Sequence, residues 1–436
     1  MIHAGLDVVR INTSYGTAHD HAAWIERVRA VAKHEGKALG ILLDTRGPKV
    51  RVGPLPQALA LQPHAEVLLG GHGIPLTQPE VLEGLRPGDR VLLADGTLEL
   101  TVIGRESSGV RARVVRGGTL VSGKGVNFPG TVVPISAIIE EDRVTLQLAR
   151  DLEVEFVALS FVQRPEEVAE AKELVGSGPA VLAKVELAAA VERMKDLVAV
   201  ADGAMVARGD LGVEIDPFQV PLVQKRLVDQ CNAHAKPVIV ATQMLKSMVD
   251  WPTPTRAEVA DVAAAVWDGA DAVMLSEETA VGKHPVEAVQ AMAQAACAAE
   301  TGEFPIRLPG LAPELVGEVP AAMAKAAVDI ARQVRAQAIV CATVSGWTAR
   351  LVASFRPCVP IVAVTPHAHV VRKLALVWGV TASEIPRVED SEALVEGALR
   401  AARELGVVGS GQRVVFTAGL PFCTPGTTNL VRVVET

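Results

Sequence analysis

Short aliphatic segments, each followed by polar residues, recur along the first two thirds of the chain. Seven of them begin at residues 7, 38, 156, 180, 203, 237 and 271. Except for one interval of 118 residues, the starts lie 23 to 34 residues apart, which is the length of a strand, a helix and two loops. Segments with helical spacing, such as PEEVAEAKELV at 165–175, lie between most of them. The pattern predicts a parallel sheet whose strands alternate with helices, either a barrel or a doubly wound fold.

Polar residues follow six of these seven predicted strands. Functional residues of (β/α)8 barrels lie at the carboxyl ends of several strands, so we favour an α/β fold of the TIM-barrel type. Only 3% of the residues are aromatic, whereas 49% are hydrophobic. A core built from Ala, Val, Leu and Ile suits strands that are buried on both faces.

The interval of 118 residues leaves room for an inserted domain. Short alternating segments with Gly, Pro and Asp-Gly turns fill residues 54–131 and predict a small β-barrel domain made of hairpins. The predicted barrel then comprises residues 1–53 and 132–302. A Pro- and Gly-rich linker at 303–320 leads into another strand–helix alternation, which predicts a doubly wound α/β domain at 318–436.

Charge and cysteine content exclude several classes of protein. The chain has 42 Lys and Arg against 50 Asp and Glu, a net charge of −8, so we expect no nucleic-acid partner. The five cysteines include no C-x-x-C pair, which favours free thiols over a zinc site or disulfides. No uncharged apolar run reaches about 18 residues, so we expect a cytoplasmic protein with no membrane partner.

Lys184 and Glu186 stand two residues apart at the end of one predicted strand, so their side chains point to the same side. Asp210 follows Gly209 at the end of the next strand. Carboxylates on adjacent strands predict a Mg²⁺ site, because Mg²⁺ binds hard oxygens and usually one or two protein carboxylates. Backbone N–H groups after the glycine are donors for a substrate carboxylate. Taken alone, these motifs also fit an ordinary ion pair and an ordinary turn.

Other predicted strands end in further polar groups. They are Arg10, Asn12 and Ser14; Asp44, Thr45, Arg46, Lys49 and Arg51; and Thr242 with Gln243. Each group by itself fits a solvated loop. Together they lie on consecutive strands of one predicted barrel, which favours a common site.

Two patterns are not interpreted as sites. GTLVSGKG at 118–125 resembles a phosphate-binding loop, but Gly125 replaces the required hydroxyl residue and Pro129 would interrupt the helix that must follow. The His-x-His pairs at 19/21 and 367/369 have no further clustered ligands, so we expect surface histidines.

The chain resembles the pyruvate kinase family over nearly its whole length. The matching segments, in the family's order, are VRINTSYG, LLDTRGPKVR, LLADG, GKGVNFPG, ALSFV, LAKVE, ARGDLGVE, ATQMLKSM, MLSEETAVGKHPVEAV and PGTTNLVRV. The resemblance implies a barrel with an inserted β domain and a C-terminal α/β domain. It also implies transfer of a phosphoryl group from phosphoenolpyruvate to ADP in glycolysis, by a homotetramer.

The resemblance further implies roles at the predicted strand ends. Lys184 matches the lysine that bridges the migrating phosphoryl group. Glu186 and Asp210 match ligands of Mg²⁺ or Mn²⁺. The backbone of Gly209 and Asp210, with the Thr242 hydroxyl, matches the cradle for the substrate carboxylate.

Other roles are implied for residues around this centre. Arg10 matches an arginine on the substrate phosphate, and Ser276 matches a serine near the region of proton delivery. The implied nucleotide contacts are Asn12, Arg51 and Lys124, the last carried by the inserted domain as a lid. The implied monovalent-cation ligands are Asn12, Ser14, Asp44 and Thr45. The loop that resembles an effector-binding phosphate loop contains Thr343, Ser345, Gly346 and Thr348, so a phosphorylated metabolite is an expected partner.

Lys49 stands where cation-dependent members of the family carry a glutamate. A lysine brings its own ammonium group, which can take over the electrostatic role of the ion. We therefore expect K⁺ to be dispensable.

Three features depart from the family. No segment before residue 7 matches the family's first barrel strand, so we count seven barrel strands and expect the native polypeptide to begin upstream of Met1. Tyr15 replaces a usual histidine near the nucleotide, and Glu277 replaces a usual glycine. Two alternatives stay open from the sequence: a metal-dependent lyase of pyruvate-type substrates, and a truncated, non-catalytic effector-binding protein.

Overall fold

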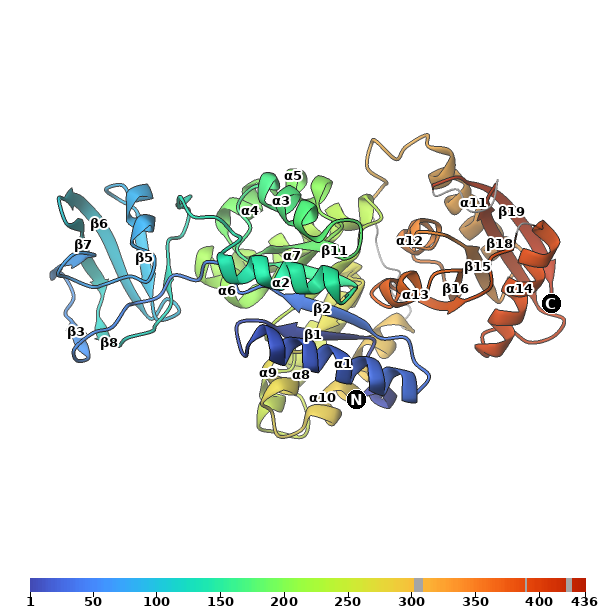
Figure 1. Cartoon of the computed structure of the whole chain (residues 1–436), viewed down its shortest axis with the longest axis horizontal. Helices are drawn as coiled ribbons and strands as arrows, with labels where there is room; N and C mark the ends of the chain where they lie inside the picture. The colour runs from blue at the N-terminus through green and yellow to red at the C-terminus, as the bar shows by residue number, and fades with distance from the viewer. Residues whose placement is uncertain (302–308, 389, 421–425) are drawn as a thin grey trace.

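The computed structural model describes residues 1–301, 309–388, 390–420 and 426–436. Figure 1 shows the inserted domain at one end, the central strand–helix domain in the middle and the C-terminal domain at the other end. Part of the predicted linker at 303–320 and Cys423 lie outside the described residues. The other four cysteines are free thiols, as expected.

The central domain contains seven parallel strands in the order β1-β2-β10-β11-β12-β13-β14. They are β1 (Val8–Asn12), β2 (Gly40–Asp44), β10 (Phe156–Leu159), β11 (Ala180–Val185), β12 (Gly203–Ala207), β13 (Val238–Ala241) and β14 (Ala272–Met274). Each begins within two residues of its predicted start. The order ends at β1 and β14 among the described residues, so the count of seven is confirmed and the barrel is open there. The inner strand β2 is wholly buried, whereas β14 is only half-buried because it lacks a second neighbour.

Helices surround this sheet and bury an aliphatic core against it. They are α1 (Ala18–His34), α2 (Glu140–Asp151), α3 (Pro165–Val175), α4 (Ala188–Glu192), α5 (Met194–Val200), α6 (Arg208–Glu214), α7 (Val220–Ala233), α8 (Arg256–Asp268), α9 (Glu277–Ala280) and α10 (Pro285–Glu300), with the short turns η1 (Ile2–Ala4), η3 (Pro217–Gln219) and η4 (Lys246–Val249). Reciprocal hydrogen bonds between Thr255 and Glu258 cap the start of α8. The turn η1 packs against α10, close enough that a Cβ on Gly5 would meet Ala293 at 2.9 Å.

The inserted domain lies between β2 and β10 and has its own aliphatic core. Its elements are β3 (Leu59–Leu61), β4 (Glu66–Leu69), η2 (Pro79–Gly84), β5 (Arg90–Leu93), β6 (Leu98–Glu106), β7 (Gly109–Arg116), β8 (Gly118–Leu120) and β9 (Val126–Asn127). They form antiparallel sheets of order β4-β7-β6-β5-β9 and β3-β8. The turn between β8 and β9 leads into a strand rather than a helix, which confirms that GTLVSGKG is no phosphate-loop motif.

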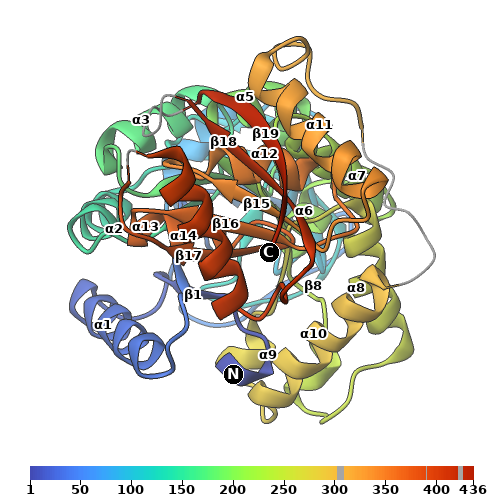
Figure 2. The ribbon, with the colours of Figure 1, turned by 90° about the vertical axis from the view of Figure 1, so that its right-hand side faces the viewer.

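The C-terminal domain is a five-stranded sheet with helices on both faces (Figure 2). Its elements are α11 (Val319–Gln333), β15 (Ala338–Ala342), α12 (Trp347–Ser354), β16 (Ile361–Thr365), α13 (Ala368–Leu374), β17 (Val380–Glu384), α14 (Ser391–Glu404), β18 (Arg413–Gly419) and β19 (Thr428–Glu435). The order β17-β16-β15-β18-β19, with antiparallel β19 at one edge, confirms a doubly wound domain. No helix of the described residues is long and apolar enough to cross a membrane.

The expectation of surface histidines is wrong at one of four positions. His19, His367 and His369 are exposed. His21 is 4% exposed, because it lies on the inner side of α1 with its Nε2 2.7 Å from the Tyr15 carbonyl oxygen.

Candidate active site

Most of the predicted site residues lie at the carboxyl ends of the barrel strands. Parallel strands all run in one direction, so these ends meet at the same edge of the sheet. The residues are Arg10 and Asn12 on β1, Asp44 on β2, Lys184 and Glu186 at the end of β11, Asp210 in the first turn of α6, Thr242 after β13 and Ser276 after β14.

Lys184 is the centre of this group and is only 8% exposed. Its Nζ lies 2.9 Å from Asp44 Oδ1 and 2.8 Å from Glu186 Oε1, and it donates to Ser160 Oγ at 2.6 Å. Burial opposes the charge on this group, but the two carboxylates outweigh burial and raise the pKa of Lys184. The ammonium group therefore stays charged.

Asp44 connects Lys184 to Arg10. Arg10 Nε donates to Asp44 Oδ2 at 2.6 Å, while Oδ1 faces Lys184. Burial disfavours the charged form of Asp44, yet Lys184 and Arg10 lower its pKa overall. Both oxygens of this predicted monovalent-cation ligand thus already face cationic side chains.

The other predicted ligands of the monovalent ion make local contacts. Thr45 Oγ1 accepts the Ser160 N–H at 2.9 Å, and Asn12 Oδ1 accepts the Ser14 N–H at 3.1 Å. Thr45 is buried, whereas Ser14 is exposed.

Glu186 and Asp210 form the predicted carboxylate pair. Glu186 is buried, and its Oε2 accepts the Phe161 N–H at 2.8 Å. Lys49 Nζ lies 3.0 Å from Asp210 Oδ1, so Lys49 meets a predicted metal ligand rather than Asp44. Burial raises the pKa of Glu186; Lys184 opposes this and the negative charge of Asp210 adds to it.

A divalent cation fits this pair, because two carboxylates that repel each other supply the hard oxygens that Mg²⁺ prefers. Among the residues that the structure describes, no group of three or more His, Cys, Asp or Glu side chains is arranged to hold a metal. An ion bound by Glu186 and Asp210 would therefore complete its coordination with water or substrate oxygens.

Thr242 lies beside the start of α6, where the predicted carboxylate cradle was placed. Its Oγ1 accepts the Gly209 N–H at 2.8 Å, and its carbonyl oxygen accepts from Arg208 Nη2 at 2.8 Å. Thr242 and Gln243 have φ values of 69° and 57°, which are uncommon for residues with side chains. Such backbone strain at a strand end is typical of a functional loop.

Ser276 has a buried hydroxyl group with no hydrogen-bond partner among the described residues. Its backbone N–H donates to Glu278 at 2.8 Å. Glu277, which replaces the usual glycine, forms an ion pair with Lys246 at the surface. Tyr15 is also at the surface and exposed.

Two of the three predicted nucleotide contacts, Arg51 and Lys124, lie at the connection between the barrel and the inserted domain, and the third lies on β1. Lys124 is exposed, and Arg51 Nη1 donates to the neighbouring Gly123 carbonyl at 2.9 Å. Asn127 Nδ2 donates to Glu214 Oε1 at 3.0 Å, which ties the inserted domain to α6. Burial raises the pKa of Glu214 to about 7.

Sequence reasoning missed Ser160, Phe161 and Glu214. Ser160 contacts both Lys184 and Asp44, and Phe161 positions Glu186 from a backbone with φ 56°. The available signal was the segment ALSFV, where a polar residue follows a strand as it does elsewhere in the barrel.

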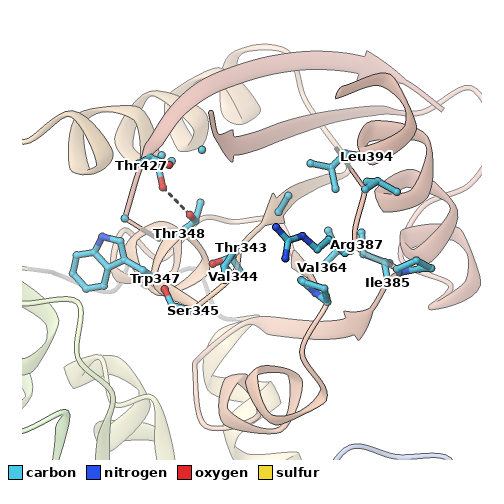
Figure 3. A pocket seen from close by; sticks show the side chains of 17 residues that line it. Thr343, Val344, Ser345, Trp347, Thr348, Val364, Ile385, Arg387, Leu394 and Thr427 are labelled. Atoms are coloured by element: carbon cyan, nitrogen blue, oxygen red, sulfur yellow. Dashed lines mark hydrogen bonds between the residues drawn. The ribbon is translucent and has the colours of Figure 1, made fainter. Parts of the chain in front are cut away.

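The predicted effector loop borders a cavity of about 60 Å³ in the C-terminal domain (Figure 3). Thr343, Ser345 and Thr348 line it, opposite the guanidinium group of Arg387. Gly346 does not line the cavity; with φ 82° it forms the turn, and its N–H donates to Thr343 Oγ1.

Lys184 is a charged lysine between two carboxylates at the strand ends of a parallel barrel, with backbone donors and a third carboxylate, Asp210, close by. Such a group is a site for anionic substrates. The fold and the site thus define an α/β-barrel enzyme of phosphoryl-transfer type.

Comparison with known proteins identifies the family. The model described as "Pyruvate kinase, barrel domain" matches residues 1–289, and "Pyruvate kinase, alpha/beta domain" matches residues 321–434. A pyruvate kinase of Agrobacterium vitis is 43% identical over 443 residues, which cover 99% of this chain and 93% of the relative. A pyruvate kinase of Geobacillus stearothermophilus is 40% identical over 448 residues, which cover 99% of this chain and 76% of the relative. A crystal structure of a pyruvate kinase from Cryptosporidium parvum superposes with a TM-score of 0.92 at 32% identity, covering 100% of this chain and 92% of that one.

The chain belongs to the pyruvate kinase family. It is a phosphotransferase of a generally metal-dependent family, as the resemblance implied. The lyase and the non-catalytic alternative are set aside.

Proposed function

We propose that the chain converts phosphoenolpyruvate and ADP into pyruvate and ATP in the cytoplasm through the group centred on Lys184. A terminal β-phosphate oxygen of ADP bonds to phosphorus, the bond from phosphorus to the enol oxygen breaks, and the enolate then takes up a proton to give pyruvate. The observation that supports this best is the ammonium group of Lys184, buried and held by Asp44, Glu186 and Ser160.

Lys184 and Arg10 supply positive charge to the phosphoryl group in this proposal. The ammonium group is a compact charge that can follow the phosphoryl oxygens as they move. Arg10 uses Nε for Asp44, which holds the planar guanidinium group in one orientation towards the substrate phosphate.

Glu186 and Asp210 would hold the Mg²⁺ or Mn²⁺ ion. When bound, that ion supplies positive charge where the enolate oxygen becomes negative. The Asp210 N–H at the start of α6 and the Thr242 hydroxyl orient the substrate carboxylate, while the Gly209 N–H fixes the Thr242 side chain. Because Thr242 Oγ1 accepts from Gly209, its own proton is directed to another acceptor.

Asn12, Arg51 and Lys124 are the proposed contacts to the nucleotide. Arg51 and Lys124 are exposed cations next to the connection between the barrel and the inserted domain. Closure of that domain would bring them over the site and exclude water. The hydroxyl of Ser276, which has no partner in residues 1–301, 309–388, 390–420 and 426–436, is a proposed group in the delivery of a proton to the enolate.

A coupled assay with phosphoenolpyruvate, ADP and Mg²⁺ tests the proposed activity directly. We expect formation of pyruvate and ATP in equal amounts, and none when the metal is removed by a chelator. Pyruvate formation without ATP would contradict the proposal, because it would indicate hydrolysis or lyase chemistry.

The proposed independence of K⁺ rests on internal cations. Asp44 faces Lys184 and Arg10, and Asp210 faces Lys49. Lys184 and Arg10 thus already balance Asp44, the one carboxylate among the proposed monovalent-ion ligands Asn12, Ser14, Asp44 and Thr45, and Lys49 adds a further cation at Asp210.

The cavity at Thr343, Ser345 and Thr348 is the proposed site for a phosphorylated effector. Hydroxyl groups from this loop and Arg387 supply donors for a phosphate group. Isothermal titration with sugar phosphates and nucleoside monophosphates tests this assignment. We expect binding that Arg387→Met abolishes and that the exposed control Arg400→Met leaves intact; no binding across the panel would refute the site.

A further inference from the structure

A second cavity lies at the junction of the barrel and the C-terminal domain, away from both sites described above. We call it the seam cavity. Its volume is about 10 Å³, and Lys236, Asp271, Arg350 and Arg356 line it. Lys236 and Asp271 belong to the barrel, whereas Arg350 and Arg356 lie on or after α12 of the C-terminal domain.

Arg356 and Asp271 neutralise each other across this junction. Arg356 Nη1 donates to Asp271 Oδ1 at 3.1 Å, and Nη2 donates to Asn232 Oδ1 at 3.1 Å. The remaining Nε of Arg356 is buried and has no hydrogen-bond partner among the described residues. This ion pair therefore still has one unused donor.

Lys236 and Arg350 bring charges that no carboxylate at the cavity balances. Lys236 donates to the carbonyl oxygens of Val198 and Ala199 at 2.6 and 2.8 Å, at the end of α5. The guanidinium group of Arg350 stacks over Trp347 at 5.1 Å, and its Nε is buried without a partner among the described residues. Burial lowers the pKa of Arg350, because its charged group loses contact with water.

Asp202, whose negative charge acts on both Lys236 and Arg350, does not balance them, because its own oxygens are already bonded. Its Oδ1 lies 2.7 Å from Lys172 Nζ, and its Oδ2 accepts the Val181 N–H at 2.9 Å. Three cations and one carboxylate thus line the seam cavity, with two buried N–H donors that no group in the described part of the chain uses. Buried charges and donors without partners are costly, so such a site favours a bound anion.

We propose that the seam cavity binds a small inorganic anion, chloride, between Arg350 and Arg356. The volume admits about one water-sized group, which fits a monatomic ion and excludes a sugar phosphate or a nucleotide. The site is therefore distinct from the effector cavity in both ligand and place.

A bound anion here stabilises the contact between the two domains. Lying between Arg350 and Arg356, it holds α12 at the barrel, because Arg356 is bonded to Asp271 and Asn232 of the barrel. The same helix also carries Trp347 and Thr348 at the effector cavity. Figure 1 shows α12 on the side of the C-terminal domain that faces the barrel. The anion thus holds the helix that connects the effector loop with the barrel.

Thermal unfolding in chloride tests the proposal. Sodium gluconate is replaced by sodium chloride at constant ionic strength, and the Tm of the full chain is measured. We expect Tm to rise by about 2 °C or more and then to saturate, because the anion binds the folded state alone. Arg350→Met should abolish the rise, whereas Arg400→Met, which removes an exposed arginine of α14, should keep it.

Bromide provides a second measurement that needs no variant. Crystals of the unaltered protein soaked in sodium bromide should show an anomalous peak in the seam cavity. A Tm independent of chloride, or a water molecule and no bromide in the cavity, would overturn the proposal even if Arg350→Met fails to fold.

Discussion

Lys184 is charged and positioned before any substrate binds, since Asp44, Glu186 and Ser160 hold its ammonium group. An interaction that strengthens as the phosphoryl group leaves should act on kcat more than on KM. Lys184→Met should therefore lower kcat by roughly 10²-fold or more, as for the loss of one preorganised donor, with a much smaller change in KM. Steady-state kinetics with phosphoenolpyruvate as the varied substrate measures both.

Stability must be controlled in this experiment. Removing one partner of a buried ion pair leaves uncompensated charge and costs about 3–5 kcal/mol. Lys184→Arg keeps the positive charge and should fold more stably than Lys184→Met. Circular dichroism first checks that both variants are folded. Their kinetics then distinguish the effect of the lost charge on kcat from an effect of lower stability. A defect confined to KM would contradict the assigned role.

Lys49 allows a second test at the scale of one residue. Because Lys49 Nζ pairs with Asp210, the unaltered enzyme should have the same rate in tetramethylammonium and potassium salts at equal ionic strength. Lys49→Glu places a carboxylate beside Asp210 and should create at least tenfold activation by KCl, or about 1.4 kcal/mol of barrier. Lys33→Glu, on the exposed face of α1, is the matched control. Tenfold activation of the unaltered enzyme would show that Lys49 does not replace the ion.

At the scale of elements, α6 connects the carboxylate pair to the inserted domain. It carries Asp210 in its first turn and ends at Glu214, which accepts a hydrogen bond from Asn127. A change in the charge of Glu214 thus acts on the junction between barrel and lid.

The raised pKa of Glu214 predicts how stability depends on pH. Its pKa is about 7 in the folded protein against an ordinary value of 4.5. Between these pH values the folded state keeps a proton that the unfolded state has lost, so the contribution of this group to stability falls as pH rises. Glu214→Gln has no such ionisation and so does not show this fall. The free energy of unfolding of the variant minus that of the unaltered protein should therefore increase from pH 5 to pH 8, by at most about 3 kcal/mol.

Urea unfolding at pH 5, 6, 7 and 8 measures this difference. Glu396→Gln, an exposed residue on α14, serves as control and should shift stability by the same small amount at every pH. A pH-independent difference for Glu214→Gln would mean that Glu214 is ionised throughout.

At the scale of the whole molecule, we propose a homotetramer that uses the outer face of the barrel. Phe218 on η3 and Leu222 on α7 are 85% and 59% exposed, which is unusual for neighbouring large apolar side chains. Phe218→Ser should shift the protein towards smaller species, as light scattering after gel filtration would show across a dilution series. Val121→Ser, in the inserted domain, should leave the mass unchanged, and a monomeric unaltered protein would contradict the proposal.

Local chemistry along the chain was enough to predict the parallel strands, the inserted domain and the doubly wound domain. Strands that are buried on both faces appear in the sequence as continuous aliphatic segments. Polar residues that follow them indicate the carboxyl-terminal edge of the sheet, where functional residues of such barrels lie. Lys184 and Glu186 were predicted to point to the same side of the sheet, because successive side chains in a strand alternate between its two sides. In the structure Lys184 Nζ lies 2.8 Å from Glu186 Oε1.

Only the tertiary structure decided which charges meet. Lys49 pairs with Asp210, 161 residues away. Ser160, which directly follows β10, contacts both Lys184 and Asp44, although β10 itself contains no charged residue. The burial of His21 also depends on packing between distant segments, as do the buried Nε donors of Arg350 and Arg356, which no described residue accepts from. The position of a residue along a strand determines the side to which its side chain points. The residue that this side chain contacts depends on the order of the strands and on the contacts between domains, and a local sequence pattern contains neither.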